Sequence, residues 1–214
     1  GHLVKPFYGF YVIVTPEHKK AVAPPPILIL DKMIKHLGLP YYLGLLSAAK
    51  YYEATHQSLM ETQVITTKAL QIKKIGKHRI RFIVNKFTEK IPTQDLKTPQ
   101  GPVKMSTPEA TVFDLIRYHK RAAGFSHVAT VLKEMVNSID TKKLNRIADI
   151  YNDTPLAQRV GYLLETQLSG LSLGALNKWL KNKECTLVRL SGKRSGQELD
   201  RNKKWHIIRD IDVE

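Results

Sequence analysis

The sequence predicts an α+β protein in which a small antiparallel-rich sheet packs with several short helices and follows a β-hairpin. Apolar residues recur at every second position in several runs between residues 61 and 105, as they do in half-buried strands. From residue 107 onward they recur at helical spacing. An apolar content of 43% over 214 residues is enough to bury a core, so a globular chain is expected.

The first 26 residues predict a hairpin and a stiff linker. The run 5–14, KPFYGFYVIV, is rich in β-formers and would turn at Tyr8-Gly9. Prolines follow at position 16 and at positions 24–26, and such runs are extended. We therefore expect a domain boundary here, which divides the chain into a hairpin, a linker and a main domain over residues 1–15, 16–26 and 27–214.

Helices are expected at residues 27–37 and 41–55, and the first of them ends before Gly38 and Pro40. Strands are then expected in the region 61–105, where the period changes to two. They cover residues 63–68, 72–77, 78–86 and 103–105, and residues 88–100 form a loop. The strand over 78–86 is the clearest: Ile80, Phe82 and Val84 point to one side, and Arg79, Arg81, Ile83 and Asn85 point to the other.

The second half of the chain reads as helices that begin at recognisable caps. Thr107-Pro108 is a helix start, because threonine is a good N-cap and proline suits the first helical position. Glu109 lies in the first turn, and Phe113 lies on the apolar face. Further helices should begin at Ser126, Asp140, Thr154-Pro155 and Leu173, and two strands should follow over 185–190 and 205–211.

A net charge of +15, with a pI near 9.8, favours a polyanionic partner such as nucleic acid, an acidic protein or an anionic membrane. The excess charge concentrates in residues 68–104 and 189–209, and it would gather on one surface if their strands shared a sheet. A merely basic protein with a solvated sheet face is the alternative. The candidate residues for nucleic-acid binding are Lys5, Lys73, Lys74, Lys77, Arg79, Arg81, Lys86, Lys193 and Arg194.

Sequence motifs for catalysis, metal binding or a cofactor are absent. The chain has no phosphate-binding glycine loop, no zinc-protease motif and no nucleophile elbow. Asp210 and Asp212 would share a strand face, but exposed acids explain them without a metal. The lone Cys185 excludes a disulfide framework and fits a reducing cytoplasm. No apolar run is long enough to span a bilayer. We expect no enzyme activity, no metal, no cofactor and no membrane partner.

One stretch resembles a known family. Residues 106–115, STPEATVFDL, are similar to the signature of AbiE-type antitoxins, the AbiEi family of predicted regulators in type IV toxin–antitoxin systems of phage defence by abortive infection. Five further stretches resemble the family in the same order: Tyr41–Gln57, Thr62–Lys68, Arg79–Lys86, Gln158–Glu165 and Lys203–Ile208. Each match is moderate alone, but the ordered set covers most of the chain.

The resemblance implies an antitoxin that is also a transcriptional autorepressor. Family members bind inverted repeats in their own operator DNA through an N-terminal winged helix-turn-helix, and their C-terminal domain neutralises a nucleotidyltransferase-like toxin. The hairpin here resembles the wing, and the helices that should precede the wing are missing. We therefore expect mainly the toxin-neutralising domain, with a basic surface that supports DNA binding.

The family motif residues are expected to be structural, and they are Thr107, Pro108, Glu109, Asp114, Arg159 and Tyr162. Two other functions stay open. A general basic nucleic-acid-binding module would bind with an affinity set by salt and without operator preference. An enzyme would lose its turnover on the change of a single residue.

Overall fold

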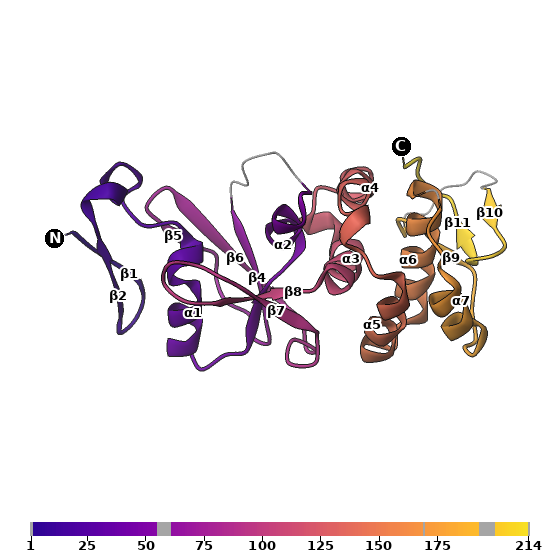
Figure 1. Ribbon diagram of the computed structural model, residues 1–214, viewed down its shortest axis with the longest axis horizontal. Coiled ribbons are helices and arrows are strands. Elements are labelled where there is room, and N and C mark those ends of the chain that lie inside the picture. The colour runs from indigo at the N-terminus through magenta and orange to yellow at the C-terminus, as the bar shows by residue number, and fades with distance from the viewer. Residues whose placement is uncertain (1, 55–60, 169, 193–199, 214) are drawn as a thin grey trace. The chain divides into compact units, whose positions relative to one another are not determined.

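The computed structural model describes residues 2–54, 61–168, 170–192 and 200–213 and confirms the α+β class (Figure 1). Contacts within the chain define two compact units. Unit 1 comprises residues 1–48 and 57–107, and unit 2 comprises residues 49–56 and 108–214. The division into hairpin, linker and main domain at residues 15 and 26 stays a prediction.

Unit 1 begins with the predicted hairpin. Strands β1 (His2–Phe7) and β2 (Phe10–Val14) pair antiparallel, and they turn at Tyr8-Gly9, where Gly9 has φ +74°. The inward face of the hairpin carries Val12 and Val14, which are buried. Val4 lies directly opposite Val12. The two paired strands and the turn between them match the predicted hairpin.

The expected extended linker is wrong over its first half. Pro16–Ala21 form a 3-10 helix, which starts with a hydrogen bond from the His18 N–H to the Thr15 carbonyl at 3.0 Å. A proline at the first position suits a helical turn as well as an extended chain, so composition alone did not distinguish the two. The helix ends at Val22, which adopts a left-handed conformation with φ +62°.

Helix α1 (Pro26–His36) agrees with the prediction and holds the hairpin in place. Its last residue, His36, makes a hydrogen bond of 3.0 Å between Nε2 and the Tyr8 carbonyl oxygen. The His36 ring also packs against Phe10, with ring centroids 5.5 Å apart. The hairpin turn is thus attached to the end of the helix.

The expected helix over 41–55 is only partly present. Tyr41–Leu43 form strand β3, α2 covers Leu45–Ala49, and Lys50–Tyr52 form a 3-10 turn. β3 lies inside the sheet, where Tyr42 and Leu43 are almost completely buried. A short apolar run that is buried on both faces has no alternation, so its period cannot distinguish a strand from a helix.

The described strands of the main sheet are ordered β5-β6-β4-β3-β8-β7 (Figure 1). Besides β3 they are β4 (Thr62–Thr66), β5 (Lys73–Ile75), β6 (His78–Val84), β7 (Thr93–Leu96) and β8 (Val103–Ser106). The β5/β6, β4/β3 and β8/β7 pairs are antiparallel, while β6/β4 and β3/β8 are parallel.

Two details of the sheet differ from the prediction. The expected loop over 88–100 contains β7, an edge strand whose exposed polar residues give no apolar alternation. In β6, Ile80 and Phe82 are buried as expected, but Val84 is 47% exposed and Ile83 is buried instead. Asn85 is also buried, and its amide donates to the Tyr42 hydroxyl at 3.3 Å. The polar face of β6 is therefore covered near its end.

Unit 2 is built from helices and a small sheet. The helices are α3 (Pro108–Arg117), α4 (Phe125–Glu134), α5 (Leu144–Tyr151), α6 (Thr154–Gln167) and α7 (Gly174–Lys181). The short strands β9 (Val188–Arg189), β10 (Arg201–Asn202) and β11 (Ile207–Ile208) are ordered β10-β11-β9. α3 is the central helix, since it contacts α4, α5 and α6 and every residue from 109 to 116 is buried.

The helices of unit 2 begin close to the predicted positions, but only some of the predicted N-cap residues act as caps. Asp140 caps as expected, because its carboxylate accepts from the Lys142 N–H at 3.0 Å. Ser126 is not a cap, because α4 begins one residue earlier and Gly124, with φ +93°, takes the N-cap position. At α6 the cap is Asp153, which accepts from the Leu156 N–H at 2.9 Å, and Thr154 is the first helical residue.

Candidate functional site

Strands β5 and β6 of unit 1 present the predicted basic side chains at the edge of the sheet. Lys74, Lys77 and Arg79 are exposed, and we call them the β5–β6 basic face. Lys74 lies directly opposite Arg79 in the antiparallel pair. Like charges in directly opposed positions destabilise a strand pair. An anion bound between them would relieve that repulsion.

The turn that carries this face is fixed by close packing. Gly76 has φ +57°, and a Cβ atom there would lie 2.2 Å from the Ala21 carbonyl oxygen. The same oxygen accepts a hydrogen bond of 3.0 Å from the Lys77 N–H. Only glycine fits this position, so the turn holds Lys77 at a defined place beside β5 and β6.

The other predicted basic residues of unit 1 already have partners. Arg81 donates from Nε to the Glu61 carboxylate at 2.5 Å, and this hydrogen bond raises the pKa of the guanidinium above its ordinary value. The ammonium of Lys73 lies 4.5 Å from the Phe7 ring centroid. Lys5 approaches Tyr8 and Tyr11 at 4.8 and 5.5 Å, and Lys86 approaches Phe87 at 5.0 Å.

The described part of the basic stretch over residues 189–209 is not part of the main sheet. Lys193 and Arg194 lie outside the described residues. The flanking strands β9 and β10 belong to the small sheet of unit 2, whereas β5 and β6 belong to the main sheet of unit 1. The described strands of the two basic stretches therefore do not share a sheet, so the condition for a single basic surface built on one sheet is not met.

The carboxylates of the family motif lie inside unit 2. Glu109 is buried and accepts from the Asp140 N–H at 2.9 Å. Asp114 is completely buried and accepts from the Tyr151 hydroxyl at 2.7 Å. Pro108 is the first residue of α3, and the Thr107 N–H donates to the Pro92 carbonyl at 3.1 Å. Tyr162 is buried on α6. These positions suit structural roles.

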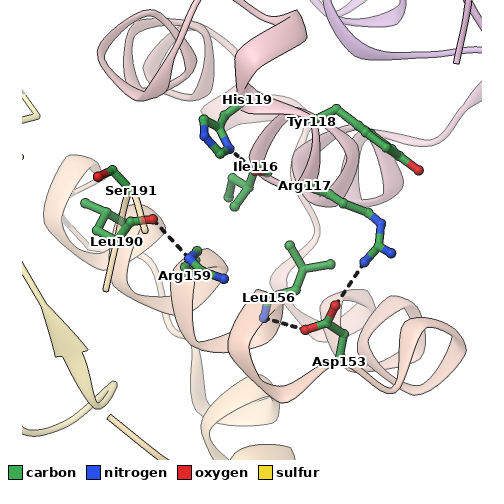
Figure 2. A pocket seen from close by; sticks show the side chains of 9 residues that line it. All are labelled: Ile116, Arg117, Tyr118, His119, Asp153, Leu156, Arg159, Leu190 and Ser191. Carbon is green, nitrogen blue, oxygen red and sulfur yellow. Dashed lines mark hydrogen bonds and ion pairs between the residues drawn. The ribbon is translucent and has the colours of Figure 1, made fainter. Parts of the chain in front are cut away.

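Arg159 of the motif lines a cavity of about 400 Å³ in unit 2 (Figure 2). Arg117, at the end of α3, donates from Nη1 to Asp153 at 2.9 Å. The other carboxylate oxygen of Asp153 caps α6. One carboxylate thus joins α3 to α6. The lining residues are Ile116, Arg117, Tyr118, His119, Asp153, Leu156, Arg159, Leu190 and Ser191.

Arg159 attaches the small sheet to α6. Its Nε donates to the carbonyl oxygens of Arg189 and Leu190 at 3.1 and 3.0 Å, and Nη2 donates to Arg189 at 2.9 Å. Burial lowers the pKa of Arg159 below its ordinary value, while the nearby carboxylates of Asp153 and Asp210 act in the opposite direction. The guanidinium therefore donates hydrogen bonds to backbone carbonyl oxygens at the end of β9 and just after it.

His119 lies at the same cavity and is held in one orientation. Its Nδ1 is 3.1 Å from the Ile116 carbonyl oxygen, and its ring stacks on Phe125 with centroids 4.0 Å apart. Burial lowers its pKa, the hydrogen bond to Ile116 opposes this, and the positive charges of Lys120 and Arg159 lower it further. The neutral ring is thus favoured at neutral pH.

The sequence alone did not identify this cavity. Arg117, His119 and Asp153 come from separate elements, and no spacing pattern connects them. Within the described part of the chain, no group of three or more His, Cys, Asp or Glu residues could hold a metal ion. In that same part no helix is both long and apolar enough to cross a membrane.

The comparisons with known proteins identify a family from a sequence model and a similar fold from a solved structure. Residues 42–166 match the family model described as the AbiEi antitoxin C-terminal domain. No curated protein matches the chain significantly. The crystal structure of the RV2827C protein from Mycobacterium tuberculosis is similar, with a TM-score of 0.67 and 17% identity, over 99% of this chain and 76% of that one.

The solution structure of the antibiotic-resistance factor ANT(2'')-Ia covers 59% of this chain and 90% of its own, at 12% identity. Its TM-score of 0.36 is too low to support an argument. The family match covers more than half of the 214 residues and spans β3 to α6, which includes the buried motif of α3. The chain therefore belongs to the AbiEi antitoxin C-terminal domain family.

Proposed function

We propose that this chain is the toxin-neutralising part of an antitoxin in a type IV toxin–antitoxin system of phage defence, acting in the cytoplasm on a nucleotidyltransferase-like toxin. The single observation that carries the proposal is the family match over residues 42–166. The match covers elements of both units, so we propose that both contribute to the antitoxin activity. The proposal assigns no catalysis to this chain.

A basic surface that supports DNA binding belongs to the same proposal. The supporting observation is the opposed pair of Lys74 and Arg79, with Lys77 held nearby by the Gly76 turn. Phosphate groups are the natural partners of such a pair. By family resemblance the DNA would be inverted repeats in the operator of the chain's own gene, which makes the antitoxin an autorepressor.

Co-expression with the cognate toxin tests the first part. Cells that express the toxin should recover growth when this chain is co-expressed. A variant with Phe113→Asp should fail to rescue, because a carboxylate in the fully buried position of α3 would unfold unit 2. Growth that stays arrested with the folded wild-type chain would overturn the proposal.

The same rescue assay separates the antitoxin from a general nucleic-acid-binding module. Changing Lys74, Lys77 and Arg79 together to Gln should weaken DNA binding but leave the rescue intact. If the triple variant also loses rescue while it remains folded, the β5–β6 basic face contacts the toxin instead. If the wild-type chain binds DNA but never rescues, the general binding module is the correct function.

A further inference from the structure

A second cavity in unit 2 is strongly basic. It measures about 530 Å³, and Lys181, Lys183 and Lys204 line it. Among the described residues that line it there is no carboxylate. The cavity lies where the end of α7 meets α6 and the chain that leads into β11. It contrasts with the cavity of Figure 2, where Asp153 pairs with Arg117.

Most of this positive charge is not neutralised. The Lys181 side chain forms no hydrogen bond or ion pair with any other residue that the structure describes. Lys183 donates from Nζ to the neutral amide oxygen of Asn152 at 3.0 Å. Lys204 is ion-paired with Glu165. Two of the lysines that line the cavity, Lys181 and Lys183, are therefore not ion-paired with any residue that the structure describes.

The walls of the cavity are set by buried contacts. Gln158 of α6 is completely buried, and its Nε2 donates to the Thr186 and Trp205 carbonyl oxygens at 2.9 and 3.0 Å. Trp205 is also completely buried. Lys204 is the chain neighbour of Trp205, and the Lys183 N–H donates to the Leu180 carbonyl oxygen at 2.9 Å, so the backbone at both lysines is held in place. The ordering cost of binding a ligand is therefore limited to the lysine side chains.

We propose that this cavity binds a compact anion that carries two or more phosphate groups. Lysine ammonium groups bind phosphate as point charges, and a concave site without a carboxylate concentrates anions. The volume falls in the range of small-ligand sites, which is roughly 300–1,000 Å³. A concave site suits a compact anion better than the convex backbone of a duplex. The proposal rests on unit 2 alone and does not depend on the antitoxin function.

The sequence supplies reporters for this site. Cys185 lines the cavity, is half-buried, and is the only cysteine among the 214 residues. The chain has two tryptophans: Trp205 lines the cavity, and the ring of Trp179 lies 5.0 Å from the Lys183 ammonium. A thiol reagent and tryptophan fluorescence therefore both report on this cavity.

Inorganic pyrophosphate is the probe, titrated at constant ionic strength into the wild-type chain. Calorimetry should show saturable binding, and bound pyrophosphate should slow the reaction of Cys185 with a thiol reagent severalfold. The variant Lys181→Gln/Lys183→Gln should bind about a hundredfold more weakly, or about tenfold for each lost charge-assisted hydrogen bond. Lys133→Gln/Lys178→Gln is the matched control, because it removes the same charge from exposed positions that do not line the cavity.

The control variant should bind pyrophosphate like the wild type. Equal affinity in all three proteins, or an equal loss in both variants, would overturn the proposal. Saturable binding that leaves the Cys185 reaction rate unchanged would place the anion elsewhere and also overturn it. Duplex DNA at the same phosphate concentration should not protect Cys185. Equal protection by DNA would mean that the ligand is a nucleic-acid backbone and not a compact anion.

Discussion

Gly161 of α6 lies directly against the indole ring of Trp205. A Cβ atom at position 161 would be 2.0 Å from Cζ3 of that ring, well inside van der Waals contact. The indole N–H donates to Glu165, one helical turn further along α6, at 2.7 Å. This contact joins the two family-like stretches Gln158–Glu165 and Lys203–Ile208, and it fixes the chain before β11 on α6.

The Gly161→Ala variant should be markedly destabilised. The added methyl group would have to displace a completely buried tryptophan, and overpacking of this kind typically costs about 1–3 kcal/mol. Urea unfolding of the wild type and the variant measures the difference in the free energy of unfolding.

Gly174→Ala is the matched control for this substitution. A Cβ atom at Gly174, the first residue of α7, would meet nothing closer than the Ser172 hydroxyl at 3.9 Å. Alanine should therefore be neutral or should stabilise by up to about 1 kcal/mol. If Gly161→Ala unfolds at the same urea concentration as Gly174→Ala, the packing of Trp205 on α6 is wrong.

Phe113→Ala should destabilise unit 2 by about 3–5 kcal/mol, which is typical of an emptied aromatic site in a core. Phe113 is completely buried in α3 and stacks on Tyr151, with ring centroids 6.0 Å apart. Leu187→Ala, at a position that is 42% exposed, should change the free energy of unfolding by less than about 1 kcal/mol. Thermal unfolding of both variants checks the prediction, and similar midpoints would contradict it.

His119 should make the stability depend on pH. Its pKa in the folded chain lies below the ordinary value of 6.5, chiefly because of burial, so the unfolded chain binds the proton more readily. This contribution to stability is complete above pH 6.5 and is lost as the pH falls through the folded pKa. The melting temperature should therefore decrease as the pH is lowered from about 7.5 to about 5.

The His119→Gln variant tests the cause of that decrease. The variant loses the stack on Phe125 and should be less stable at every pH. It should also lose part of the pH dependence between about pH 7.5 and about pH 5, because glutamine does not titrate. An unchanged slope of melting temperature against pH would show that another group is responsible.

Arg79 and Arg81 share a strand face but should differ in DNA binding. Arg79 is exposed beside Lys74, whereas Arg81 is held by Glu61. Arg79→Ala should make the salt dependence of duplex binding shallower by roughly one unit, with affinities in the micromolar range or weaker. Arg81→Ala should leave that slope nearly unchanged. Binding measured over a series of salt concentrations compares them, and equal slopes for both variants would refute the distinction.

Local patterns in the sequence were sufficient for most elements. The alternation from Arg79 to Phe82, the proline-started helix at Pro108 and the turn at Tyr8-Gly9 each follow from interactions between residues near one another in the chain. The stretches that resemble the AbiEi family could also be recognised from the sequence, because a motif consists only of the order of residues. These features are determined by the sequence by itself, because short-range sterics and the burial of one apolar face are enough to specify them.

The tertiary structure alone decided the rest, because long-range contacts override local preference. Tyr41–Leu43 became a strand because β4 and β8 lie on either side of it. Glu61 holds Arg81 in an ion pair, so this arginine is not free to bind a phosphate. Arg117 at the end of α3 lies at one cavity with Asp153, the N-cap of α6, and Arg159 of α6, although 36 residues separate Arg117 from Asp153. No local sequence pattern specifies these long-range contacts. Each depends on how distant elements pack and on the need of buried polar groups for hydrogen-bond partners.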